Sequence, residues 1–93
     1  MTVESDVEKH FVKLAKENKA WALKFTSPGT RGVPDRIVIR YDGGIEFVEL
    51  KKPGESLRPS QKVVKKILER YGHTVTVLDT KADVTEYWRL RRA

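Results

Sequence analysis

The sequence predicts an α/β fold in which one layer of sheet is covered by helices. Three segments carry apolar residues at helical spacing, and four shorter segments are rich in alternating or β-branched apolar residues. Their order along the chain is helix, three strands, helix, strand, helix. Because the chain contains no internal repeat, low-complexity segment or linker, we expect residues 1–93 to form a single domain.

The first predicted helix covers residues 2–18, and its apolar residues recur at helical spacing: Val3, Val7, Phe11 and Leu14. Ser5 and Glu8 have the spacing of a capping box within this stretch. A strand follows at residues 21–25, because Trp21, Leu23 and Phe25 alternate with Ala22 and Lys24. The long loop after it, residues 26–34, is interrupted repeatedly by Gly and Pro.

Residues 35–41 and 45–51 flank Asp42-Gly43-Gly44, which predicts an antiparallel hairpin with a three-residue loop. In this register Arg40 lies opposite Glu46, and the odd-numbered residues share one face, which we expect to be buried. Ile37 then lies opposite Glu49 and Asp35 opposite Lys51, so three charged groups meet at the end away from the turn. A shift of one residue would separate Asp35 from Glu49.

The remaining elements follow from turn and capping signals. Pro59 suits the first position of a helix that ends near Gly72 and directs these residues inward: Val63, Val64, Ile67, Leu68 and Tyr71. Residues 74–78 are β-branched and predict a strand. Residues 80–83 can cap a final helix that carries Val84, Tyr87, Trp88 and Leu90.

Composition narrows the classes of partner. Nineteen Lys and Arg against 13 Asp and Glu give a net charge of +6, which favours a polyanion such as a nucleic acid. The absence of cysteine excludes disulfides and thiolate zinc sites. No run approaches the roughly 20 apolar residues of a membrane helix, so we expect a soluble, cytoplasmic protein. With 39% hydrophobic residues the core is modest, and a second subunit would help to stabilise it.

The three charged residues of the hairpin suggest metal-dependent chemistry. Two neighbouring carboxylates, Asp35 and Glu49, can share a hard divalent cation, and the Lys51 ammonium can orient a water or stabilise charge on a phosphate. Taken singly, Asp35 reads as a turn residue, and Glu49 and Lys51 as solvent-facing strand residues. On a buried face, however, charges need partners or a metal, and this favours a functional site.

Gly32-x-Pro34-Asp35-Arg36, then Glu49-x-Lys51 and then Gln61, resemble the VRR-NUC branch of the PD-(D/E)XK nuclease superfamily. The resemblance spans nearly the whole chain. It implies a restriction-endonuclease-like αβββαβ core with a mixed sheet flanked by helices, followed by a C-terminal helix. Stand-alone members of this branch are similar to Holliday junction resolvases and are typical of phages and bacteria.

The resemblance also implies residue roles. Asp35 and Glu49 would bind Mg²⁺ or Mn²⁺ together with the backbone carbonyl of Leu50, and Lys51 would position the nucleophilic water. A glutamate from the first helix would join them: Glu8 fits best, Glu4 competes with it, and capping with Ser5 is the alternative for Glu8. Gln61 would contact the site from the second long helix or merely satisfy a backbone amide there.

These expectations lead to a functional hypothesis. The protein would be a homodimeric, metal-dependent endonuclease that cuts branched DNA, most naturally four-way junctions, in a bacterial or phage-infected cell. We expect it to use no organic cofactor and to bind no membrane. The residues expected to hold DNA phosphates are Arg31, Arg36, Lys52 and Arg58. The alternatives are a non-catalytic basic module that binds nucleic acid, and a nuclease that acts on flaps or linear duplex.

Overall fold

The computed structural model describes the chain from Val3 to Ala93, and its side chains from Asp6 onward. Helix α1 (Val3–Glu17) is followed by three strands, β1 (Trp21–Lys24), β2 (Arg36–Ile39) and β3 (Ile45–Leu50). Helix α2 (Pro59–Arg70), strand β4 (Val75–Leu78) and helix α3 (Lys81–Arg89) complete the fold. The predicted order of elements is confirmed.

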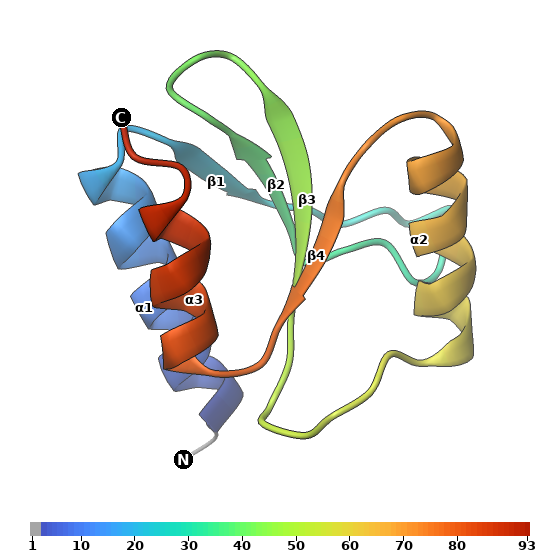
Figure 1. The fold of residues 1–93 in the computed structure, drawn as a ribbon. Coiled ribbons are helices and arrows are strands. Elements are labelled where there is room, and N and C mark those ends of the chain that lie inside the picture. The colour runs from blue at the N-terminus through green and yellow to red at the C-terminus, as the bar shows by residue number, and fades with distance from the viewer. Residues whose placement is uncertain (1–2) are drawn as a thin grey trace.

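The four strands form one mixed sheet in the order β1-β2-β3-β4. β1 and β2 pair antiparallel, as do β2 and β3, whereas β3 and β4 pair parallel and are joined by the crossover helix α2. Helices α1 and α3 lie side by side on one face of the sheet, and α2 lies on the other (Figure 1). This is the restriction-endonuclease-like arrangement that the sequence predicted.

The hydrophobic core lies between the sheet and the pair α1 and α3. The sheet contributes even-numbered residues, and the two helices contribute aliphatic and aromatic residues from their inner sides. The core consists of Val7, Phe11, Ala15, Val38, Val48, Leu50, Leu78, Val84, Tyr87 and Trp88. The expectation that the odd-numbered face of the hairpin holds the core was therefore wrong. Most odd-numbered apolar residues are half-buried or exposed, because α2 covers that face with fewer large side chains.

The hairpin register also differs from the predicted one, by two residues. Ile37 pairs with Phe47 and Ile39 with Ile45, because the three-residue loop comprises residues 41–43 and not residues 42–44. The Arg40 amide donates to the Gly44 carbonyl at 2.8 Å, and Gly43 takes the left-handed position with φ 87°. A shift of two residues keeps every side chain on its predicted face, so Asp35 still lies beside Glu49.

The helix boundaries follow the predicted signals. Pro59 is the first residue of α2, and Gly72 follows its end with φ 89°. Thr80 caps α3, since its hydroxyl accepts from the Asp83 amide at 3.0 Å. Val64 is buried as predicted, but three other residues that were expected to face inward are exposed: Val63, Ile67 and Tyr71. Among the helices that the structure describes, none combines the length and apolar character needed to cross a membrane.

A buried ionic cluster closes the core at the hairpin turn. Glu46 is 3% exposed and accepts hydrogen bonds from Arg40 (2.8 Å), Arg91 (2.7 Å) and the Tyr87 hydroxyl (2.9 Å). The predicted Arg40–Glu46 pair thus forms, although the two residues are not directly opposite. Burial by itself raises the pKa of Glu46, but the bonds from Arg91, Arg40 and Tyr87 outweigh it and hold the pKa below its ordinary value.

Candidate active site

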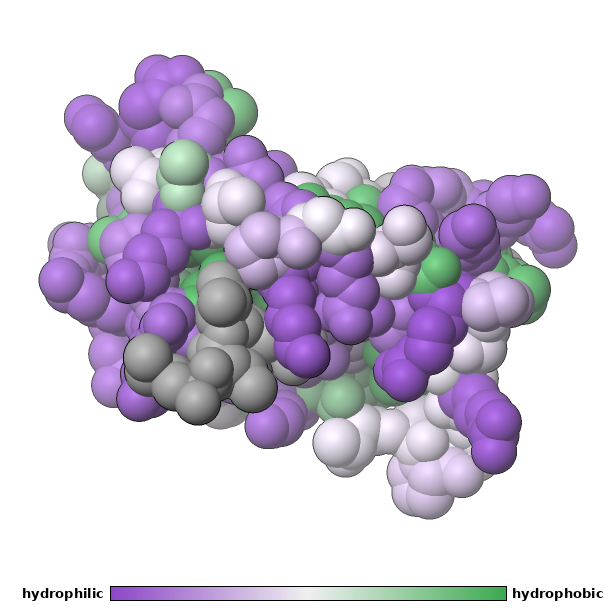
Figure 2. Space-filling model, turned by 90° about the horizontal axis from the view of Figure 1, so that it is seen from below, coloured by the Kyte–Doolittle hydropathy of each residue, from purple (hydrophilic) through white to green (hydrophobic). Residues whose placement is uncertain are grey.

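The acidic and basic residues of the motif lie at the end of β2 and β3 opposite the hairpin turn. Asp35 directly precedes β2, Glu49 is the penultimate residue of β3, and Lys51 follows that strand. The Leu50 amide donates to Asp35 Oδ2 at 2.7 Å, which ties the two strands together at the site. Figure 2 views the molecule from the side of the β3–α2 loop, where hydrophilic side chains predominate.

Glu49 and Lys51 are joined by Gln61 from the first turn of α2. Gln61 Nε2 donates to Glu49 Oε2 at 2.9 Å, and Lys51 Nζ donates to Gln61 Oε1 at 2.9 Å. The distance between the Lys51 ammonium and Glu49 Oε2 is 3.7 Å. Gln61 Oε1 also accepts from the Arg58 amide at 2.8 Å, so this side chain both contacts the site and caps α2. Gln61 thus combines the two alternatives that the sequence left open, contact with the site and satisfaction of a backbone amide.

Glu49 is a buried carboxylate that lies beside a second carboxylate, Asp35. Glu49 is 3% exposed, and burial together with the negative charge of Asp35 raises its pKa from 4.5 to about 7, despite the opposing effect of Lys51. A divalent cation between the two carboxylates would relieve this repulsion, because it favours the charged form of both. The residues present therefore fit a hard, oxygen-liganded metal ion.

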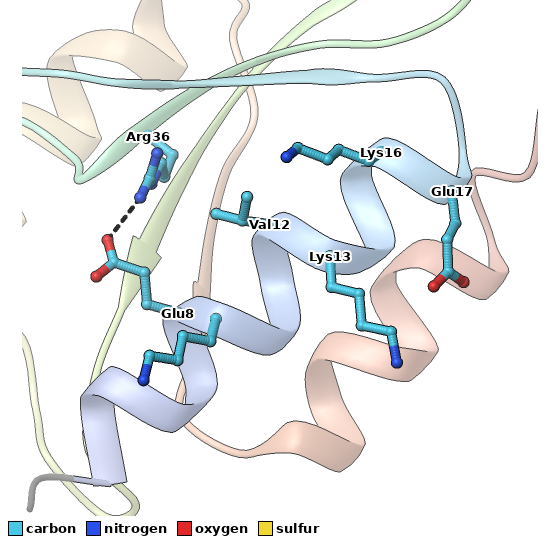
Figure 3. Close-up of a pocket in the computed structure, with 7 residues that line it drawn as sticks. Glu8, Val12, Lys13, Lys16, Glu17 and Arg36 are labelled. Carbon is cyan, nitrogen blue, oxygen red and sulfur yellow. Dashed lines mark hydrogen bonds and ion pairs between the residues drawn. The ribbon is translucent and has the colours of Figure 1, made fainter.

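Glu8 approaches the same place from α1. A small cavity of about 170 Å³ is lined by Glu8, Lys24, Asp35 and Leu50. Arg36 Nη2 donates to Glu8 Oε2 at 2.8 Å, as the dashed line in Figure 3 shows, and Arg36 Nη1 donates to the Ala22 carbonyl at 3.1 Å. Since Arg36 is only 13% exposed at its side chain, this bond fixes Glu8 at the rim of the cavity.

The structure bears on the alternatives for the first helix. Because α1 begins at Val3, Ser5 lies inside the helix and does not occupy the capping position. The Glu4 side chain lies outside the described residues. Among the described side chains, no group of three or more His, Cys, Asp or Glu residues is arranged to hold a metal. Asp35 and Glu49 interact as a pair of carboxylates, since the charge of Asp35 raises the pKa of Glu49.

The residues expected to hold DNA occupy different positions around this centre. Lys52 and Arg58 line a cavity of about 240 Å³ together with Lys51, Glu55 and Ser56. Arg31 is exposed on the loop that precedes β2, whereas Arg36 points at Glu8. Sequence reasoning missed Lys24, although the alternation in β1 sets it opposite Arg36 and thus near the end of the strand that faces the site.

Comparisons with known proteins agree with this geometry. No family model matches the sequence. The chain is 46% identical over 78 residues to a protein of Acyrthosiphon pisum secondary endosymbiont phage 1 named "Putative nuclease p44", a match that covers 84% of each protein. A solved structure described as "VRR_NUC domain" superposes with a TM-score of 0.89 at 26% identity, covering 96% of this chain and 97% of the other.

Fold and motif together define a class, the nucleases whose acid and Glu-x-Lys residues meet at one end of a mixed sheet. Within that class, the chain belongs to the VRR-NUC family.

Proposed function

We propose that this protein is a divalent-metal-dependent endonuclease that hydrolyses phosphodiester bonds in branched DNA. The single observation that supports it most is the buried pair of Glu49 and Lys51, bridged by Gln61 and set against Asp35. A buried acid whose pKa stays near 7 despite a neighbouring lysine serves no evident structural purpose in a small core. A functional role accounts for it better.

Each residue has a distinct task in this proposal. Asp35, Glu49 and the Leu50 carbonyl would hold Mg²⁺ or Mn²⁺, and Glu8, which is paired with Arg36, would stand at the rim of the cavity outside this ligand set. The bound ion would supply Lewis-acid stabilisation of the scissile phosphate and a lowered pKa for the attacking water. Lys51 orients that water, and Gln61 holds the Lys51 ammonium in place. The phosphate contacts proposed around this centre are Lys52, Arg58 and Arg31, whereas Arg36 is engaged with Glu8 and the Ala22 carbonyl.

A four-way junction is the proposed substrate because it requires paired cuts on strands related by a two-fold axis. A two-fold dimer with one site in each subunit supplies such cuts. The surface proposed to form the dimer, here called the apolar face, lies on the α2 side of the sheet. It combines a cross-strand row with one side of α2 and consists of Trp21, Ile39, Ile45, Val63, Ile67 and Tyr71.

The apolar face has the character of a protein interface. Trp21 is 64% exposed and Tyr71 is 76% exposed, and the six residues carry no charge in a chain with 34% charged residues. A surface without cations does not suit DNA, and a second copy of this +6 chain can approach closely where charge is absent. The two aromatic side chains, at ~150–250 Å² each and at these exposures, give an exposed area on the order of 300 Å² per copy. A polar rim would extend this toward the ~800 Å² per partner of a standard interface.

The experiment that tests the function is cleavage of a labelled four-way junction beside a linear duplex of matched sequence. Wild type and Glu49→Ala are compared with Mg²⁺, with Mn²⁺ and with chelator. We expect symmetric nicks near the junction that require both the metal and Glu49.

Equal cutting of junction and duplex would keep the nuclease site but remove the junction assignment. Salt-sensitive binding without cleavage by wild type in either metal would replace the enzyme with a non-catalytic DNA-binding module.

A further inference from the structure

A groove along α1 adjoins the candidate active site, and its lysines have no role in the proposal so far. It encloses about 620 Å³ and is lined by Glu8, Lys9, Val12, Lys13, Lys16, Glu17 and Arg36. In Figure 3 the side chain of Lys16 extends over Val12 toward the side of Arg36. We call this feature the α1 groove.

The α1 groove is positively charged. Lys9, Lys13 and Lys16 are exposed, and among the described side chains no acid lies within 4.0 Å of their ammonium groups. Of the two acids in its lining, Glu8 is already neutralised by Arg36 at 2.8 Å. The three lysines therefore present charge that the protein itself does not compensate, on side chains long enough to follow a ligand.

The α1 groove leads into the site. Glu8 lines both the α1 groove and the small cavity that contains Asp35 and Leu50. Lys9 and Lys16 are seven residues apart, which corresponds to about 10.5 Å along a helix axis. A stacked DNA strand advances ~3.4 Å per nucleotide, so this distance spans about three phosphates. The spacing suits a strand whose backbone enters the site along α1.

We propose that the α1 groove binds the backbone phosphates that flank the scissile bond, with Lys9 and Lys16 as the main contacts. This inference rests on the proposed nuclease function, since it assigns the path of that substrate. An acidic protein segment would also meet the charge requirement, but the continuity with the Asp35 cavity favours the strand that is to be cut.

The test measures DNA binding without cleavage. A fluorescein-labelled four-way junction is titrated in chelator at several salt concentrations, with wild type, Lys9→Gln/Lys16→Gln and Lys62→Gln/Lys66→Gln. The last variant is the matched control, because it removes two exposed lysines from α2 on the other face of the sheet. Far-ultraviolet circular dichroism verifies that all three proteins are folded.

We expect the α1 variant to bind about 10- to 100-fold more weakly at ~0.1 M salt. Its slope of log K against log salt concentration should be less steep by about 1.8, as the loss of two phosphate contacts on duplex arms requires. The α2 control should bind as wild type does. In cleavage assays the α1 variant should raise KM by more than it lowers kcat.

Equal losses in both double variants would overturn the proposal, because they would reflect net charge alone. An unchanged α1 variant, or a wild type that does not bind DNA, would also overturn it. If wild type binds DNA through the α1 groove but never cleaves it, the groove stands and the nuclease function fails.

Discussion

Gln61 Nε2 donates a hydrogen bond to Glu49 Oε2 at 2.9 Å, and both side chains are buried between α2 and β3. The Oε1 atom of Gln61 accepts hydrogen bonds from Lys51 Nζ and from the Arg58 amide. One side chain thus links the start of a helix to the acid and the base of the motif. In the proposed mechanism it would act as a positioning residue, because it holds the groups that are proposed to touch the substrate and the metal.

Replacing Gln61 should therefore impair cleavage by more than it impairs folding. Gln61→Met keeps the size of the side chain but removes its three hydrogen bonds. We expect the single-turnover rate at saturating Mn²⁺ to fall about 10- to 100-fold, which is typical for partners of metal-site residues. Lys62→Gln, one residue further along α2, should cleave at the wild-type rate. A wild-type rate in Gln61→Met would remove Gln61 from the site.

Metal binding should depend on both acids of the carboxylate pair. By isothermal titration calorimetry, wild type should bind Mn²⁺, whereas Asp35→Asn and Glu49→Gln should each lose at least tenfold in affinity because an oxygen ligand has lost its charge. Glu69→Gln on α2 replaces an acid that pairs with Lys65 at 2.7 Å and should have no effect. Equal affinity in all four proteins would place the metal elsewhere.

The close approach of the loop to α2 predicts a strong effect at Gly32. Its φ is +84°, and an added Cβ would collide with the Ser60 carbonyl, which belongs to the α2 backbone and cannot rotate away. We expect Gly32→Ala to lower the free energy of unfolding by about 1–3 kcal/mol in urea denaturation. Gly29→Ala is the control in the same loop, since nothing lies within 4 Å of its added Cβ. Similar stabilities for the two variants would contradict this account.

The Glu46 cluster should make stability depend on acid. The pKa of Glu46 is lowered on folding. Its contribution to the free energy of unfolding is therefore fully present above the ordinary pKa of 4.5, and it is lost as the pH falls through the lower pKa of the folded state. We expect Glu46→Gln to reduce the free energy of unfolding by about 1–3 kcal/mol at pH 7. The difference from wild type should shrink below pH 4.5. A constant difference down to pH 3 would exclude Glu46 as the titrating group.

The proposed dimer should dissociate when charge enters the apolar face. Sedimentation equilibrium of wild type at micromolar concentration should give twice the chain mass, because exposed aromatic residues such as Trp21 and Tyr71 would become buried. Val63→Asp/Tyr71→Asp should sediment as a monomer with unchanged circular dichroism. Lys62→Asp/Lys66→Asp adds the same residues on the outer side of α2 and should remain dimeric. A monomeric wild type would remove the dimer from the proposal.

Local signals predicted the elements of the fold well. Pro59 and Thr80 mark the starts of α2 and α3 because capping depends on residues close in sequence. The identity of the core face was predicted wrongly, since it depends on which helices pack on which face. The even-numbered Val38 and Val48 are buried because Phe11 and Trp88 reach that face from opposite ends of the chain.

The grouping of the candidate site residues was predictable, because alternate residues of a strand lie on the same face of the sheet. Asp35, Glu49 and Lys51 stay on one side of the hairpin under a shift of two residues, so the error in the turn did not disperse them. The Arg36–Glu8 bond was not predictable, because it depends on how α1 packs against β1 and β3. Neither was the α1 groove, because its shape depends on how α1 lies against Arg36 of the sheet.

The two faces of the sheet differ in how firmly they hold their helices. The aromatic side chains of Phe11, Tyr87 and Trp88 pack together on the α1 and α3 side, whereas Val64 is the one buried apolar residue within α2. Detachment of α2 should therefore cost less free energy than global unfolding, and it would withdraw Gln61 from the site. On heating, the enzyme would then lose activity before it loses its core, and amide hydrogens of α2 would exchange ahead of those of α1.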